Sequence, residues 1–295
     1  MYELHQIAQN TFYIDSPTKI GIYRANESEV YLIDSGNDKD AGKKIRKILE
    51  EQHWSLKAII NTHSNADHIG GNRYLQQQTG CPIFAPGIEA AFTRHPILEP
   101  SFLYGGYPCR DLRHKFLLAA ESQVSGMDDP DFPKELTPIP LRGHFFDMIG
   151  IRTPDQVIFL ADCISSRRTL EKYQITFIYD VAEYLRTLDQ VEKLEAELFV
   201  PAHAETSADV RELVDLNRRT VLSISEKIQS LLQTPLSFEE LLQQLFDQYG
   251  LTMNFEQYVL VGSTVRSYLS WLKDQGCITA AFTDNRLLWS VCQGD

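Results

Sequence analysis

The stretch NTHSNADHIGG, residues 61–71, places His63, Asp67 and His68 within six residues and ends on a glycine pair. It overlaps the apolar run 56–63, which is typical of a strand buried on both faces. Asp67 and His68 are adjacent, so on a regular strand they would point to opposite faces. They can reach one place only on a loop that leads into a helix. This stretch therefore predicts a buried strand, a tight loop and a helix, with three metal-type ligands between them.

Three further metal-type side chains follow predicted strands. They are His144 in LRGH, Asp162 in FLAD and His203 in VPAH. We expect all three to face the same sheet edge as His63, because open α/β sheets present functional residues at strand ends. A single histidine after a strand is usually an ordinary surface or core residue. That interpretation suits the other four histidines, whereas agreement among several separate positions favours a metal site.

The rest of the first 205 residues alternates strand and helix patterns, which predicts an α/β fold. Strands are expected at 11–15, 21–25, 30–36, 56–63, 81–86, 136–143, 156–162 and 198–204, and helices at 38–52, 70–80 and 180–197. Residues 95–135 break this pattern with aromatic residues, glycine and proline. So long an excursion inside a compact domain is typical of a lid.

Residues 206–295 have a helix-rich pattern and form a second predicted unit. A long amphipathic segment is followed by a capping box from Ser237 to Glu240. A further helix ends at Gly276, and a hairpin turns at Asp284 and Asn285. Helices with a terminal hairpin predict a winged-helix-like module, which could form a dimer contact or a wall of the active site.

Composition limits the partners of the chain. With 28 basic and 40 acidic residues among 295, the net charge is -12, which disfavours nucleic acid. The five cysteines are odd in number and scattered, as in a reducing cytoplasm. No secretory signal or apolar span of membrane length is visible, so we expect a cytoplasmic protein with a small-molecule substrate. A homodimer is one option for its assembly.

The ordered motifs HSNADH, Gly143-His144, Ala161-Asp162 and Ala202-His203 resemble those of metallo-β-lactamase-fold hydrolases. The resemblance implies a four-layer αββα sandwich, here residues 1–205 with the lid-like insertion, followed by the module 206–295. It also implies a metal centre for Zn²⁺, as one or two ions, with Fe or Mn as alternative metals. The implied first site uses His63, position 65 and His144. The second uses Asp67, His68 and His203, and Asp162 bridges the two.

Asn65 departs from the family pattern, which usually has histidine there. An amide oxygen is a weaker and harder ligand than imidazole, so the first site should hold its metal less tightly. Asn65 could ligate through its oxygen, through a bridging water, or only hydrogen-bond near the metal. Ala161 and Ala202 also stand where the family often has glycine.

The predicted mechanism is attack of a metal-bound hydroxide on a carbonyl or phosphorus centre. Asp67 is the candidate catalytic residue that orients or deprotonates the water, and Asp34 is expected to brace the motif loop. Tyr104 and Tyr107 could donate hydrogen bonds to a substrate or could only pack the lid. Cys109 and Cys163 are interpreted as packing residues.

The leading functional hypothesis is a metal-dependent hydrolase of a small ester, thioester or lactone. The second is a mononuclear iron oxidoreductase resembling persulfide dioxygenases, because His63, His144 and Asp162 provide two histidines and one carboxylate. The third is a metal-dependent nuclease, which is disfavoured because residues 206–295 carry 11 acidic and 7 basic side chains. A catalytically inactive member of the family is a fourth hypothesis, disfavoured because only one ligand position is altered.

Overall fold

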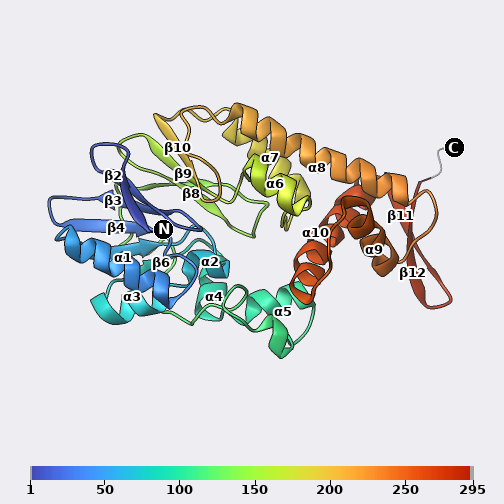
Figure 1. The fold of residues 1–295 in the computed structure, drawn as a ribbon, viewed down its shortest axis with the longest axis horizontal. Coiled ribbons are helices and arrows are strands. Elements are labelled where there is room, and N and C mark those ends of the chain that lie inside the picture. Colours follow the sequence, from blue (N-terminus) through green and yellow to red (C-terminus); the bar gives the residue numbers. More distant parts are fainter. Residues whose placement is uncertain (1, 293–295) are drawn as a thin grey trace.

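The computed structural model describes residues 2–292, and two β-sheets form its centre (Figure 1). The first sheet has the strand order β1-β2-β3-β4-β5-β6. Its strands are β1 Glu3–Gln6, β2 Thr11–Asp15, β3 Ile20–Arg24, β4 Glu29–Ile33, β5 Ser55–Ile60 and β6 Ile83–Phe84. β1 to β4 pair antiparallel, whereas β4, β5 and β6 run parallel. Parallel neighbours place the loops after β4 and β5 at one sheet edge.

The second sheet has the strand order β10-β9-β8-β7. Its strands are β7 Thr137–Pro140, β8 Ile149–Arg152, β9 Val157–Ala161 and β10 Leu198–Pro201. β9 and β10 run parallel, so the residues after both strands, Asp162 and His203, leave the sheet on the same side.

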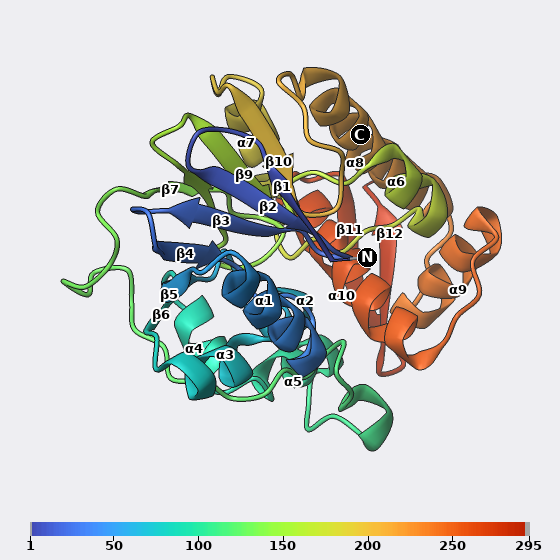
Figure 2. The same ribbon diagram turned by 60° about the vertical axis from the view of Figure 1, so that its left-hand side comes forward.

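Helices cover the outer face of each sheet, which gives four layers (Figures 1 and 2). α1 Lys39–Glu51 and α3 Asn72–Thr79 pack on the first sheet through a core that includes Ile45, Leu75 and Ile22. α7 Val181–Val191 and α8 Arg211–Leu231 pack on the second. The predicted αββα sandwich is confirmed.

The two sheets face each other across a third apolar cluster that includes Tyr31, Ile60, Ile151 and Phe159. A glycine permits a close approach between them. A Cβ built on Gly21 would lie 2.6 Å from Cε1 of Phe159, closer than packed atoms can come.

Some short helices follow the strands that lead to the predicted ligands, and others form part of the segment expected as a lid. They are α2 Ala66–Ile69, α4 Glu89–Arg94, α5 Leu98–Tyr104, the 3-10 turn η1 Arg110–Leu112 and α6 Arg167–Tyr173. Leu103, Leu112 and Leu117 of the predicted lid pack with Val259.

The C-terminal part consists of the far end of α8, then α9 Phe238–Tyr249, α10 Phe255–Asp274 and the hairpin β11 Ile278–Thr283 with β12 Arg286–Val291. The capping box at Ser237 and the hairpin turn at Asp284 and Asn285 are confirmed. One continuous buried cluster joins these helices to α7 and the second sheet. The division at residue 205 stays a prediction.

The boundaries of some predicted elements differ from those in the structure. The helix expected over 180–197 ends at Val191, because the chain then turns so that Glu197 donates its N–H to the Gln156 carbonyl at the start of the second sheet. β1, β8, α4, α5 and α6 were not predicted. Within residues 2–292 no helix is long and apolar enough to cross a bilayer, and the five cysteines are unpaired.

Candidate metal centre

The motif loop runs from the end of β5 at Ile60 into α2. Asp67 and His68 lie in this short helix, as their adjacency required. The glycine pair that follows packs against the loop after β4. A Cβ on Gly70 would lie 2.2 Å from the Asn37 carbonyl carbon, and one on Gly71 would lie 2.3 Å from the Ser35 oxygen. Only glycine allows the motif to sit this close to its neighbour.

The structure brings the predicted ligands into two adjoining groups. His63, His144 and Asp162 form one, and Asp67, His68 and His203 form the other, each with potential ligand atoms within 4.8 Å of one another. Asp162 contacts both groups. Its Oδ1 lies 3.1 Å from Nε2 of His68, and its Oδ2 lies 3.6 Å from Nε2 of His144 and 3.3 Å from Nε2 of His203.

These spacings suit a metal ion. Two ligand atoms bound to one tetrahedral zinc at about 2.0–2.1 Å lie about 3.4 Å apart. The ligand atoms of Asp162 and its histidine neighbours match that spacing, as does the 3.2 Å from Asp67 Oδ2 to His203 Nε2. Nε2 of His63, Nε2 of His68 and Oδ1 of Asp162 are buried and make no hydrogen bond, although the last two lie 3.1 Å apart. Such atoms are costly unless an ion satisfies them.

Each of the four histidines makes a hydrogen bond through Nδ1. The partners are Thr62 Oγ1 for His63, Asp34 Oδ2 for His68, the Phe177 carbonyl for His144 and the Pro17 carbonyl for His203, at 2.7–3.1 Å. With the ring proton on Nδ1, each Nε2 presents its lone pair to the centre. This is the arrangement of metal-bound histidine.

Asp34 braces the motif as predicted. It follows β4, adopts a left-handed backbone with φ of 65°, and is 3% exposed. Its Oδ1 accepts the Thr62 N–H at 2.8 Å, and its Oδ2 accepts the Thr62 hydroxyl and His68 Nδ1–H at 2.7 Å each. One carboxylate therefore fixes both the loop and the His68 tautomer.

Burial and charge shift the pKa values of the cluster in opposite directions. Burial lowers the pKa of His63 and of His144. Burial also opposes charge on His203, but Asp162 and Asp67 outweigh it and raise that pKa to about 10. Burial would raise the pKa of Asp162, yet His203 and His68 hold it well below its usual range. The two carboxylates therefore require positive charge, which protons or a divalent ion can supply.

Two buried glutamates that the sequence analysis missed hold the motif loop from the other side. Glu89 on α4 accepts the Ser64 N–H, the Ser64 hydroxyl and the Asp147 N–H, and burial raises its pKa to about 7. Glu99 on α5 contacts Asn65. The sequence held one clue to Glu99, because it is the only charged residue in positions 96–109.

The structure does not bring Tyr104 and Tyr107 to the ligand cluster. The Tyr104 ring packs edge-on against Phe255 of α10 with centroids 6.0 Å apart. Tyr107 is 73% exposed, and its hydroxyl accepts from Arg113. Their role toward substrate stays a prediction. Cys163 is fully buried, which raises the pKa of its thiol, and Cys109 packs with the apolar cluster of the predicted lid.

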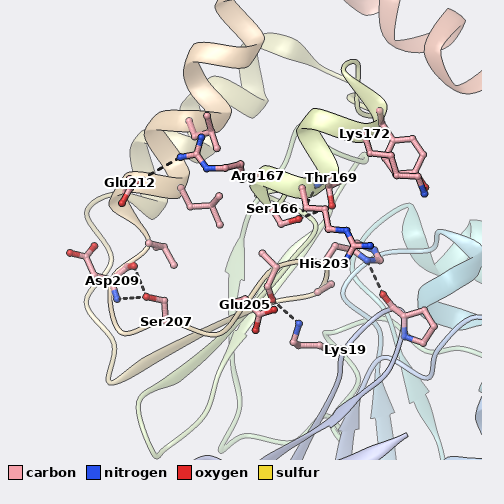
Figure 3. Close-up of a pocket in the computed structure, with 18 of the residues that line it drawn as sticks. Lys19, Ser166, Arg167, Thr169, Lys172, His203, Glu205, Ser207, Asp209 and Glu212 are labelled. Carbon is pink, nitrogen blue, oxygen red and sulfur yellow. Dashed lines mark hydrogen bonds and ion pairs between the residues drawn. The ribbon is translucent and has the colours of Figure 1, made fainter. Parts of the chain in front are cut away.

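A pocket of about 1150 Å³ opens beside His203 (Figure 3). Arg167, Arg168 and Lys172 of α6 form one wall, with Lys19 on the other side of His203. Glu205, Asp209 and Glu212 also line it, and Arg167 pairs with Glu212 at 3.5 Å. In a chain of net charge -12, the four basic side chains of this pocket slightly outnumber its three acidic ones.

A family model described as the Metallo-beta-lactamase superfamily matches residues 14–203, a span that includes every predicted ligand. The chain belongs to this superfamily. The family and the fold of the chain are therefore established, and its predicted ligand motifs come in the order that the family pattern has. The family typically holds zinc, which these residues suit.

Individual relatives of this superfamily protein cover less of it. A hydroxyacylglutathione hydrolase of Hyphomonas neptunium is 44% identical over 41 residues, 14% of this chain and 16% of that protein. A probable metallo-hydrolase of Bacillus subtilis, YybB, is 33% identical over 89 residues, 29% of this chain and 40% of that protein. The chain thus aligns with less than half of either curated relative.

Solved structures match almost the whole chain. A beta-lactamase domain protein from Burkholderia ambifaria superposes with a TM-score of 0.75 at 14% identity and covers 98% of this chain and 94% of its own. At that identity the match shows the fold alone. It extends through the C-terminal helices and hairpin.

Proposed function

We propose that the chain is a metal-dependent hydrolase of a small ester, thioester or lactone, with one or two Zn²⁺ ions held by the predicted ligands. Residues 1–205 would form the catalytic domain, and residues 206–295 a module that closes one side of it. The observation that supports this best is the convergence of four imidazole Nε2 atoms and two carboxylates, with each imidazole held through Nδ1. The unpaired cysteines suit the cytoplasm.

When bound, the metal would supply a nucleophile from water at neutral pH and polarise the substrate carbonyl. Asp67 would take the proton of that water. Its Oδ2 accepts the Thr18 hydroxyl at 2.8 Å and lies 3.2 Å from His203 Nε2. The Thr18 hydrogen bond fixes the direction in which the carboxylate faces. A general base held in this way contributes about 10²- to 10⁴-fold to the rate.

The pocket beside His203 supports a substrate with an anionic group. Arg167, Arg168 and Lys172 are exposed side chains on the wall formed by α6, the first helix after Asp162. A carboxylate at the far end of an acyl or thiol group would be attracted to this wall. Among the three substrate classes, we favour a thioester of an anionic thiol, in keeping with the names of the hydroxyacylglutathione hydrolase relatives.

A second candidate function is that of a mononuclear iron oxidoreductase. His63, His144 and Asp162 form a separate group of two histidines and one carboxylate, which is the set that non-haem iron oxygenases use. Iron content together with thiol-dependent oxygen uptake would support this function. Zinc content without oxygen uptake would count against it.

The test of the leading proposal is an assay of purified protein, stripped and then loaded with Zn²⁺, Mn²⁺ or Fe²⁺. Matched thioesters and esters with and without a carboxylate form the panel. We expect activity that the His68→Ala variant loses. Arg168→Ala should raise KM for the anionic thioester and leave the neutral one unchanged, whereas Lys47→Ala, an exposed control on α1, should change neither. No activity with any metal, and no difference between wild type and His68→Ala, would refute it.

A further inference from the structure

Asn65, where the motif departs from the superfamily pattern, is held between two polar side chains. Its Oδ1 lies 3.2 Å from Nε2 of His144, in the group formed with His63 and Asp162. Its Nδ2 donates to Oε1 of Glu99 at 2.7 Å. The amide therefore turns its oxygen toward the ligand cluster and its nitrogen away from it.

Glu99 is a buried carboxylate whose side chain reaches the motif loop. It belongs to α5 and is 4% exposed. Burying a carboxylate is unfavourable unless specific partners compensate. Its hydrogen bond to Asn65 joins the predicted lid directly to the motif loop. Burial raises the pKa of Glu99, whereas the hydrogen bond from Asn65 lowers it. In its ionised form the carboxylate only accepts hydrogen bonds and so selects the NH₂ side of the amide.

The contact between Asn65 and His144 is also suited to a bound cation. Nδ1 of His144 faces the Phe177 carbonyl at 3.1 Å, so in the neutral ring this nitrogen carries the proton. Nε2 then presents a lone pair toward Asn65 Oδ1, which is also an acceptor. Two acceptors 3.2 Å apart repel each other unless a proton on Nε2 or a metal ion lies between them. The spacing matches two ligands of one ion.

We propose that Glu99 is a positioning residue that fixes the Asn65 amide with its oxygen toward His63, His144 and Asp162, so that Asn65 serves as an oxygen ligand of the first metal. The inference rests on the metal role proposed above. The first site then has two imidazole nitrogens and two oxygens, a harder set than three histidines and one carboxylate. Such a set shifts preference toward Mn²⁺ or Fe²⁺, while the second site keeps its two histidines.

The test is the number and affinity of metal ions bound by Glu99→Gln, measured by equilibrium dialysis with elemental analysis and by competition with a chromophoric chelator. The glutamine introduced at position 99 can donate as well as accept, so it no longer selects one orientation of Asn65. We expect wild type to bind two ions. Glu99→Gln should bind the tighter ion unchanged and the weaker one about 10- to 100-fold less tightly. The unchanged ion shows that the variant is folded.

A reciprocal exchange separates orientation from packing. An aspartate introduced at position 65 presents oxygen whichever way it faces, and a glutamine at position 99 can donate to it. Asn65→Asp combined with Glu99→Gln should therefore restore the weaker ion. Glu89→Gln is the matched control, because Glu89 is a neighbouring buried glutamate that holds Ser64 but has no hydrogen bond to Asn65. It should leave the ratio of the two affinities unchanged.

Several outcomes would overturn the inference: wild type that binds only one ion, two ions bound normally by Glu99→Gln, equal loss of both ions, an equal effect of Glu89→Gln, or no rescue by the added Asn65→Asp change. Wild type that binds no ion at all would instead refute the proposed function itself.

Discussion

Replacing Asp34 by asparagine should disable one metal ligand without touching the metal. The Oδ2 atom of Asp34 accepts from both the Thr62 hydroxyl and Nδ1 of His68, each at 2.7 Å. The amide must place its NH₂ group against either the Thr62 N–H or the Nδ1–H of His68. In the second orientation the NH₂ group can donate to the Thr62 hydroxyl, which can rotate, but it meets the Nδ1–H of His68 as a second donor. The His68 proton must then move to Nε2, the atom that faces Asp162.

The cost can be worked from these contacts. One charge-assisted hydrogen bond is lost outright, which is about 1.5–3 kcal/mol of the free energy of unfolding. A ligand in the wrong tautomer should weaken metal binding at the second site about 10- to 100-fold. The first loss is read by denaturant unfolding of the metal-free protein, the second by chelator competition.

Asp155→Asn is the matched control. Asp155 also accepts a backbone N–H and a threonine hydroxyl, from Asn10 and Thr11, but its hydrogen bonds are to these residues and not to the motif loop. We expect it to lower stability and leave metal affinity unchanged. If Asp34→Asn binds metal as tightly as wild type, or if both variants weaken binding equally, the tautomer argument is wrong.

Three further predictions concern single side chains. In metal-free protein, the pKa of His203 is raised from 6.5 to about 10. Its stabilising charge is therefore fully present below pH 6.5 and is lost as pH rises toward 10. The Tm measured with chelator should fall over that range more than the Tm of loaded protein, and parallel curves would contradict this. Asp67→Asn should lower kcat about 10²- to 10⁴-fold in fully loaded enzyme, and a normal kcat would exclude Asp67 as the base. Gly21→Ala should destabilise the fold by about 1–3 kcal/mol in urea unfolding, since its Cβ meets the Phe159 ring, and an unchanged midpoint would show that the sheets can separate there.

The sequence predicted which side chains converge, because metal chemistry restricts residue types. His63, His144, Asp162 and His203 each follow an apolar run, and such runs end where a chain leaves a sheet. The expected strands 56–63 and 156–162 were too long for this same reason. β5 ends at Ile60 and β9 at Ala161, because the following residues must turn out of the sheet for their side chains to converge. Ala161 makes that turn with φ of 49°, which explains why the family often has glycine there.

The residues that support the ligands were harder to predict, since any carboxylate can serve and spacing carries no signal. Glu89 and Glu99 lie on short helices of an irregular segment, and only the fold places them under the motif loop. β8 was missed because Ile149–Arg152 is short and contains a glycine, although Gly150 is required where Leu141 and the Phe159 carbonyl approach it.

The most direct test of the metal centre is anomalous X-ray diffraction at the zinc edge from crystals grown with zinc. We expect one peak among Asp67, His68, His203 and Asp162, and a second, weaker peak among His63, His144 and Asp162 on the side of Asn65. Crystals that diffract well but show no peak between these side chains would contradict the account.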